Sequence, residues 1–134
     1  MSKERFAERQ ADVRESATRL AQAVAQPEGS LIRDATIQRF KFTFDVVWKT
    51  LKLYLERQGD ECGGPRPTLK KAFAENLIAT PEEADVWLAM LEDRNLTSHA
   101  YDEALASRIY RHIVDDYAPL LAGMATKIQA LQWD

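Results

Sequence analysis

The sequence predicts an all-α protein, an antiparallel up-and-down bundle of four longer helices and one short helix. Three observations support this fold class. Apolar residues recur every three or four positions along most of the chain, as they do on the buried face of a helix. The sequence contains no hairpin dipeptide and no sustained alternation of apolar and polar residues, the two patterns that would indicate β-strands. The segment Thr80-Pro81-Glu82-Glu83 has the residue order of an N-terminal capping box.

The first two predicted helices make up the N-terminal part of the chain. One covers residues 3–25 and ends before the breaking segment 27–30, and the next covers residues 32–58 and ends at Gly59. Phe42 and Trp48 fall off the apolar stripe of the second helix, which indicates either a surface for a partner or a helix buried on two sides. The expected stripes are Phe6, Val13, Ala17, Leu20 and Val24, then Phe40, Phe44, Val47 and Leu51.

The remaining helices follow a loop over residues 60–67, which holds two Gly and two Pro. A short helix is expected over residues 68–77, and a fourth helix follows Thr80 and reaches Arg94. Asp102 is a good N-cap for the last helix, which Pro119 should kink or break. The expected stripes are Ala84, Trp87, Leu88 and Leu91 in the fourth helix, then Leu105, Ile109, Ile113, Tyr117, Leu120, Met124, Ile128 and Leu131 in the last.

Length and composition favour one globular domain, and we expect residues 1–134 to form a single helical-bundle domain. No apolar run approaches the roughly 18–20 residues that span a membrane. The N-terminus is charged, unlike a signal peptide, and Cys62 is alone, so that no internal disulfide can form. These features predict a cytoplasmic protein without membrane contact.

Charge is distributed unevenly along the chain. Residues 31–71 hold nine Lys and Arg against five Asp and Glu, whereas the whole chain has a net charge of −3. The net charge excludes a protein that binds nucleic acid through its overall positive charge. A basic sector could still face an anionic ligand, although most of these side chains also fit a solvated helix face.

The segment from Arg94 to Asp102 concentrates reactive side chains at a junction between two helices. It reads R-N-x-x-x-H-x-Y. An Arg side chain can hold a phosphate through two parallel hydrogen bonds, and a His side chain can move a proton near neutral pH. On a continuous helix Arg94 and His99 would lie about 140° apart. Either the helix ends between them, or each side chain meets groups of another chain.

The same segment could act as a shared site in a dimer. If residues 99–101 are extended, His99 and Tyr101 point the same way. Dimerisation around the junction would bring two Arg and two His together, which suits RNA cleavage by internal transfer. The alternative interpretation is structural: Arg94 pairs with Glu92, Asp93 or Asp102, and His99 caps a helix.

Other polar positions are secondary candidates. Asp34 could orient the Arg or His of the junction from a facing helix. Arg33 and Arg39 lie about 240° apart on their helix and fit a solvated surface, although Arg39 could flank a surface for a partner. His112 and Arg108 are neighbours at i and i+4, and they fit a solvated helix face better than a second site.

Two separated segments carry a family resemblance. Residues 33–44 read R-D-x-x-I-Q-R-F-x-F-T-F and continue into V-W-K-T-L-K, and residues 87–101 read W-L-A-M-L-E-D-R-N-L-T-S-H-A-Y. Both segments, in this order, resemble the HEPN superfamily. Within it, the chain is most similar to the nucleotidyltransferase substrate-binding proteins, which are related to the HepT toxins. The resemblance covers about residues 31–122.

The resemblance implies a homodimer in which the R-x-x-x-x-H motifs of both chains line a shared cleft. It also implies a metal-independent ribonuclease toxin that uses no cofactor and acts on RNA. A minimal nucleotidyltransferase antitoxin would silence it by AMP transfer to a tyrosine. Arg94 and His99 are then the catalytic pair, Asn95 is the supporting polar residue, and Tyr101 is the AMP acceptor.

The substrate-binding branch of the family implies a second possibility. Its members share the motif, and a non-catalytic subunit that binds a separate nucleotidyltransferase would carry the same residues. The chain has no nucleotidyltransferase motif of its own, such as G-S followed by paired Asp. It is therefore not expected to transfer nucleotides alone.

Overall fold

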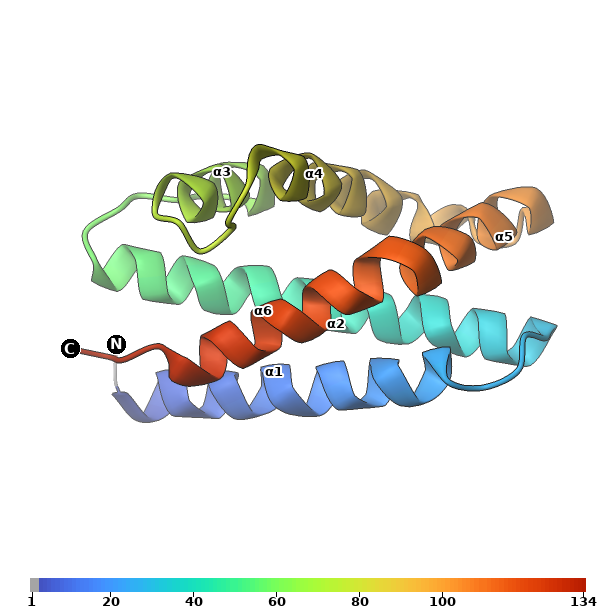
Figure 1. Ribbon diagram of the computed structural model, residues 1–134, viewed down its shortest axis with the longest axis horizontal. Helices are drawn as coiled ribbons and strands as arrows, with labels where there is room; N and C mark the ends of the chain where they lie inside the picture. Colours follow the sequence, from blue (N-terminus) through green and yellow to red (C-terminus); the bar gives the residue numbers. More distant parts are fainter. Residues whose placement is uncertain (1–2) are drawn as a thin grey trace.

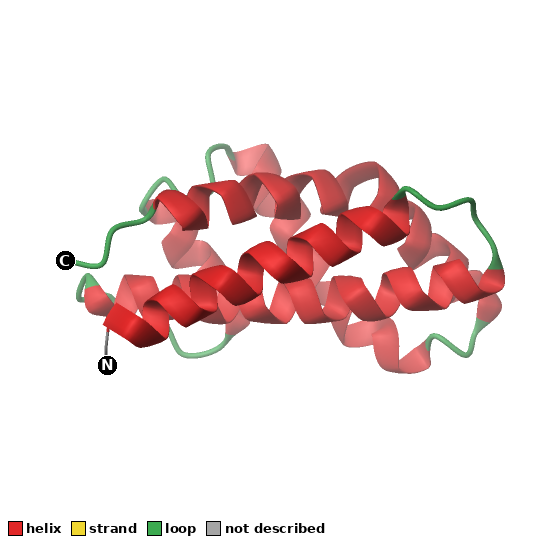
Figure 2. Cartoon of the chain, turned by 90° about the horizontal axis from the view of Figure 1, so that it is seen from below, coloured by secondary structure: helices red, strands yellow, loops and turns green. Residues whose placement is uncertain are grey.

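The structure, a computed structural model, describes residues 3–134, and within this range it consists of helices and connecting loops without a strand (Figure 2). The all-α prediction is confirmed. The elements are α1 (Lys3–Val24), α2 (Ser30–Arg57), α3 (Pro65–Ala74), α4 (Pro81–Leu96), a 3₁₀ turn η1 (Thr97–His99), α5 (Glu103–His112), a π-helical turn η2 (Ile113–Tyr117) and α6 (Ala118–Ala130).

The longer helical elements, α1, α2, α4 and the run from α5 to α6, alternate in direction along the long axis of the molecule (Figure 1). α1 packs on α2 and α6, and α3 packs on α2 and α4. α5, η2 and α6 continue from one another as the predicted last helix, and η1 lies against α2 at the start of this helix. The start of α1 and the end of α6 lie at the same end of the bundle (Figure 1). None of the described helices is long and apolar enough to cross a membrane.

Two helix ends follow from glycine and asparagine in the left-handed conformation. Gly59 has φ 101°, and the N–H of Asp60 donates to the carbonyl of Leu55 at 3.0 Å. This is the Schellman arrangement, and it ends α2 at the predicted position. Asn76, with φ 64°, follows the end of α3 in the same way.

The predicted start of α3 was three residues late. We expected residues 60–67 to be loop, but α3 begins at Pro65 and includes Pro67. Proline is tolerated there because the N–H groups of the first helical turn need no partner within the helix.

The N-terminal cap of α4 is formed as predicted. The side chain of Thr80 accepts a hydrogen bond from the N–H of Glu83 at 3.1 Å. The carboxylate of Glu83 in turn accepts from the N–H of Ala79 at 3.2 Å, one residue before the cap. The cap fixes the start of the helix that carries Arg94 near its C-terminal end.

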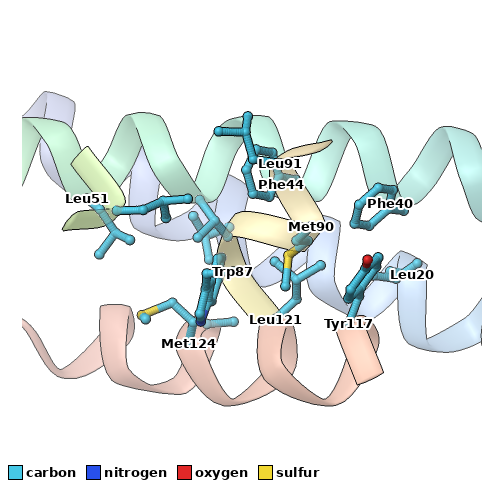
Figure 3. Packing of buried hydrophobic residues seen from close by; sticks show 14 of the residues in the cluster. Leu20, Phe40, Phe44, Leu51, Trp87, Met90, Leu91, Tyr117, Leu121 and Met124 are labelled. Atoms are coloured by element: carbon cyan, nitrogen blue, oxygen red, sulfur yellow. The ribbon is translucent and has the colours of Figure 1, made fainter. Parts of the chain in front are cut away.

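Aromatic side chains form the centre of the core (Figure 3). The rings of Phe40 and Tyr117 stack with centroids 5.4 Å apart, and Trp87 is fully buried beside Phe44. Burial of one such side chain stabilises the fold by about 1.5–3 kcal/mol. In the last helix Leu121 is fully buried in place of the predicted Leu120, because it lies nearer the middle of the face that Tyr117 begins.

The predicted break at Pro119 takes the form of a π-helical turn. Pro119 has no N–H to donate to the carbonyl four residues earlier. Directly before it, the N–H of Ala118 donates to the carbonyl of Ile113, five residues earlier. The wider turn lets the chain continue into α6, and it places Tyr117 in the core.

Candidate active site

Arg94 lies in the last turn of α4, and its guanidinium is held by Asp45 of α2. Nε donates to Oδ1 and Nη2 donates to Oδ2, each at 2.9 Å. The two side chains are 28% and 24% exposed, so that the pair lies at the rim of the bundle. The hydrogen bonds that Arg94 donates to Asp45 raise the pKa of Arg94 further above its ordinary value, against a smaller opposing effect of burial. Arg94 therefore carries its positive charge in a fixed orientation.

The ion pair uses only one edge of the guanidinium. A guanidinium has five N–H groups, and Asp45 accepts from the edge formed by Nε and Nη2. The edge formed by Nη1 and Nη2 has no protein partner among the described residues. That edge can bind an oxyanion through two parallel hydrogen bonds while Asp45 keeps the group in place.

The carboxylates predicted as alternative partners of Arg94 do not pair with it. Glu92, Asp93 and Asp102 do not bind it, and Asp34 does not reach it. Asp34 and Asp45 are eleven residues apart and therefore share one face of α2, within about 20°. The sequence shows that a carboxylate on this face could meet Arg94. The packing of α4 on α2 selects the carboxylate three turns further along.

His99 closes the 3₁₀ turn η1, and its side chain is exposed. The helix ends between Arg94 and His99, one of the two predicted arrangements, and the hydroxyl of Thr97 donates to the carbonyl of Arg94 at 2.7 Å where α4 stops. Asp102, rather than His99, caps the next helix by accepting from the N–H of Leu105. The imidazole is therefore left without a capping role.

Residues 99–101 form a turn and are not extended, so the conditional expectation of an extended segment is wrong. The two rings still approach each other: the His99 and Tyr101 centroids are 6.1 Å apart in an edge-on arrangement. Tyr101 is 83% exposed. Asn95 is exposed in the last turn of α4, and within residues 3–134 its side chain makes no hydrogen bond.

A buried carboxylate beside Arg94 organises the other side of α4. Asp93 is 7% exposed, and its Oδ2 lies 2.7 Å from Nδ1 of His112 and accepts a hydrogen bond from the Tyr117 hydroxyl at 2.7 Å. Burial, and then the bond to Asp93, raises the pKa of Tyr117 above its usual value. The His112 side chain is 42% exposed, as expected for a solvated face, but its contact with the buried Asp93 was not predicted. The wide η2 turn, which places Tyr117, was not visible in the sequence.

Arg33 and Arg39 of α2 form hydrogen bonds to neighbouring helices that were not predicted. Arg33 donates to Glu103 at 2.6 Å and lies 3.4 Å from the hydroxyl of Ser107, which ties α2 to α5. Arg39 donates to the carbonyl of Arg19 at 2.8 Å and ties α2 to α1. The predicted solvated surface is therefore wrong for Arg33, whose side chain is 14% exposed, whereas the Arg39 hydrogen bond lies at an exposed position.

Large apolar side chains are exposed on α2 and at the junction. Phe42 is 57% exposed and Leu31 is 82% exposed, and both lie within about 60° of Asp45 on the same face of α2. The side of α2 that carries Phe42 is thus not buried. Of the two predicted interpretations, a surface for a partner remains. Trp48 is half-buried and packs against the core.

Comparison with known proteins identifies the family of the chain. Residues 8–130 match the model of the family described as "Nucleotidyltransferase substrate binding protein like". The chain belongs to this family. The match includes most of α1, which lies outside the residues that carry the resemblance.

Two relatives of this nucleotidyltransferase substrate-binding-like protein are informative. The "Probable ribonuclease HepT" of Haemophilus influenzae is 30% identical over 95 residues, which is 64% of this chain and 63% of the relative. A crystal structure of a protein from Thermus thermophilus superposes with a TM-score of 0.80 at 34% identity. That similarity covers 87% of this chain and 98% of the other. These comparisons support a HepT-like HEPN protein.

Proposed function

We propose that the protein is the toxin subunit of a HEPN and minimal nucleotidyltransferase toxin–antitoxin pair, a ribonuclease that cleaves RNA without a metal ion. One observation carries the proposal. Arg94 has one guanidinium edge without a protein partner in the described part of the chain, and the exposed imidazole of His99 follows it five residues later. The relationship to the Haemophilus protein named as a probable ribonuclease supports it.

The chemistry follows from what the side chains can do. A base removes the proton of the RNA 2′-OH, the 2′-oxygen bonds to phosphorus, and the bond to the 5′-oxygen breaks. An acid protonates the departing 5′-oxygen, which leaves a 2′,3′-cyclic phosphate and a 5′-OH. His99 acts as acid or base, and the unoccupied edge of Arg94 stabilises the charge on the phosphoryl oxygens. Asn95 supports the site as a polar neighbour.

The site is composite, formed across a homodimer. Within one chain Arg94 is directed to α2 while His99 is exposed on η1, and the structure gives no contact between them. A second copy docked around the α4–α5 junction would set the His99 of one copy against the Arg94 of the other. The exposed Phe42 and Leu31 provide apolar surface for such docking.

Mixing two inactive variants tests the composite site. Arg94→Ala and His99→Ala are each expected to be inactive. Subunit exchange between them forms heterodimers in which one site regains both wild-type side chains, so that cleavage returns in part. If heterodimers form and remain inactive, the pair does not act across the interface in the proposed way.

Tyr101 is the proposed control point, through AMP transfer from ATP by the partner nucleotidyltransferase. The Tyr101 hydroxyl oxygen would bond to the α-phosphorus, and pyrophosphate would leave. The side chain is exposed, and its ring lies beside that of His99, so that an attached AMP would cover the imidazole. Incubation with partner and ATP should add the mass of one or more AMP units to the wild-type chain, and none to Tyr101→Phe. An unchanged wild-type mass with an active partner would contradict this role.

The alternative is a non-catalytic subunit that binds a separate nucleotidyltransferase, and the description of the matching family favours it. The two functions differ in their effect on cells. The ribonuclease predicts growth arrest on expression and relief by His99→Ala. The binding subunit predicts no arrest and a stable complex with the nucleotidyltransferase.

A further inference from the structure

A basic groove lies between α1 and α2, beyond the Arg94–Asp45 pair. It has a volume of about 290 Å³, and its lining includes Trp48. We call this groove the α1–α2 basic groove. Its charged lining residues are Arg5, Arg9, Lys49, Lys52 and Glu56. Four cations thus face one carboxylate, although the whole chain has a net charge of −3.

Most of this positive charge is not neutralised by the protein. Arg9, Lys49 and Lys52 form no ion pair with any of the described residues. The ammonium group of Lys49 instead lies 6.0 Å from the centre of the Trp48 ring. Cations that form no ion pair within residues 3–134, such as Lys49 and Lys52, attract anions from solution.

The groove and Asp45 of the candidate active site lie on the same face of α2. Asp45, Lys49 and Lys52 lie within about 60° of one another on α2, and Lys49 is about 6 Å along the helix axis from Asp45. The Arg94–Asp45 pair has no net charge, so that it can orient a phosphate but attracts a polyanion weakly. The positive charge that would attract a polyanion to the site is therefore supplied by Lys49, one helical turn from Asp45.

We propose that the α1–α2 basic groove binds the phosphate backbone of a single-stranded RNA whose scissile phosphate lies at Arg94. Lysine and arginine at successive helical turns provide sequence-independent charge, and the half-buried Trp48 provides an aromatic wall, the combination that single-strand binding surfaces use. This inference rests on the proposed ribonuclease function and adds a substrate-binding surface outside the motif.

The test measures how binding of a fluorescent single-stranded oligoribonucleotide depends on salt, with His99→Ala as an uncleaving background. Each phosphate contact contributes about 0.7 to the slope of log K against log salt for a single strand, so that removal of two lowers its magnitude by about 1.4. Lys49→Ala with Lys52→Ala should show this shift. Lys49→Arg with Lys52→Arg should keep the original slope.

Arg66→Ala with Lys70→Ala provides the matched control, because it removes two exposed cations of α3 that do not line the groove. This pair should leave the slope unchanged. Equal shifts in the groove and control variants, or no shift in the groove variant, would overturn the proposal. So would a groove variant that binds RNA normally but no longer binds the nucleotidyltransferase, since the groove would then be a protein-docking surface. If the groove variant shows the shift and the wild-type chain cleaves no RNA, the groove stands and the ribonuclease function fails.

Discussion

Asp45 and Arg94 are 49 residues apart in the sequence, and two parallel hydrogen bonds of 2.9 Å join their side chains. The pair fastens the last turn of α4 to the middle of α2. It also fixes which edge of the guanidinium faces the protein and which edge can bind a ligand. The motif arginine is thus positioned by a residue outside the R-x-x-x-x-H motif.

Replacement of Asp45 should reduce RNA cleavage more than it reduces stability. Asp45→Asn removes the charge and one of the two bonds, so that Arg94 is no longer held in one orientation. We expect kcat/KM for RNA to fall about 10–100-fold and the free energy of unfolding to fall by about 1 kcal/mol. Cleavage rates and urea unfolding measure the two effects. Asp34→Asn, on the same face but exposed, is the control, and wild-type cleavage by Asp45→Asn would remove the positioning role.

The hydrogen bond from Tyr117 to Asp93 should contribute measurably to stability. Tyr117→Phe keeps the stacked ring but takes one donor from a carboxylate that is almost fully buried. The expected loss of unfolding free energy is about 1–3 kcal/mol, measured by urea unfolding. Tyr110→Phe is the matched control, since Tyr110 is also buried but makes no side-chain hydrogen bond in residues 3–134. Equal losses in the two variants would mean that the bond to Asp93 contributes nothing.

The same tyrosine should make stability fall at high pH. Burial and the bond to Asp93 raise the pKa of Tyr117 in the folded protein above its usual value of about 10. The folded state therefore keeps a proton that the unfolded chain loses, and the stabilisation is lost as pH rises above about 10. Urea unfolding on both sides of this pH should show a steeper fall for wild type than for Tyr117→Phe. Parallel curves would contradict the assignment.

Cys62 should react slowly in the native protein. Its side chain is buried, and burial raises the pKa of the thiol above its usual value, so that little thiolate forms near neutral pH. A chromogenic disulfide reagent should modify the single thiol much faster in concentrated urea than under native conditions. Equal rates would show that residue 62 is accessible in the folded state.

The fold could be predicted from the sequence because its signals are local. The apolar stripes, the cap at Thr80 and the glycine at position 59 act within a few residues of themselves. The structure confirms the cap and the glycine, and most stripe positions are buried or packed against the core. Trp87, which belongs to the predicted stripe of the fourth helix, lies in the core.

The partners of the site residues could not be predicted in the same way. Asp34 and Asp45 present the same chemistry on one face of α2, and only the axial position of α4 decides which one meets Arg94. The bonds of Asp93 to His112 and Tyr117 likewise depend on the π-helical turn, whose extra residue leaves no periodic signal in the sequence. Contacts between helices require their relative register, which a single sequence does not give.

The measurement that tests the central proposal most directly is cleavage of total RNA and tRNA by the purified chain in the presence of a chelator, beside His99→Ala. Circular dichroism and the dimeric mass would first show that both proteins are folded and assembled alike. The ribonuclease proposal predicts fragments that end in a 2′,3′-cyclic phosphate with wild type and none with the variant. Intact RNA after incubation with a folded, dimeric wild-type protein would contradict it, and would leave the nucleotidyltransferase-binding subunit as the better account.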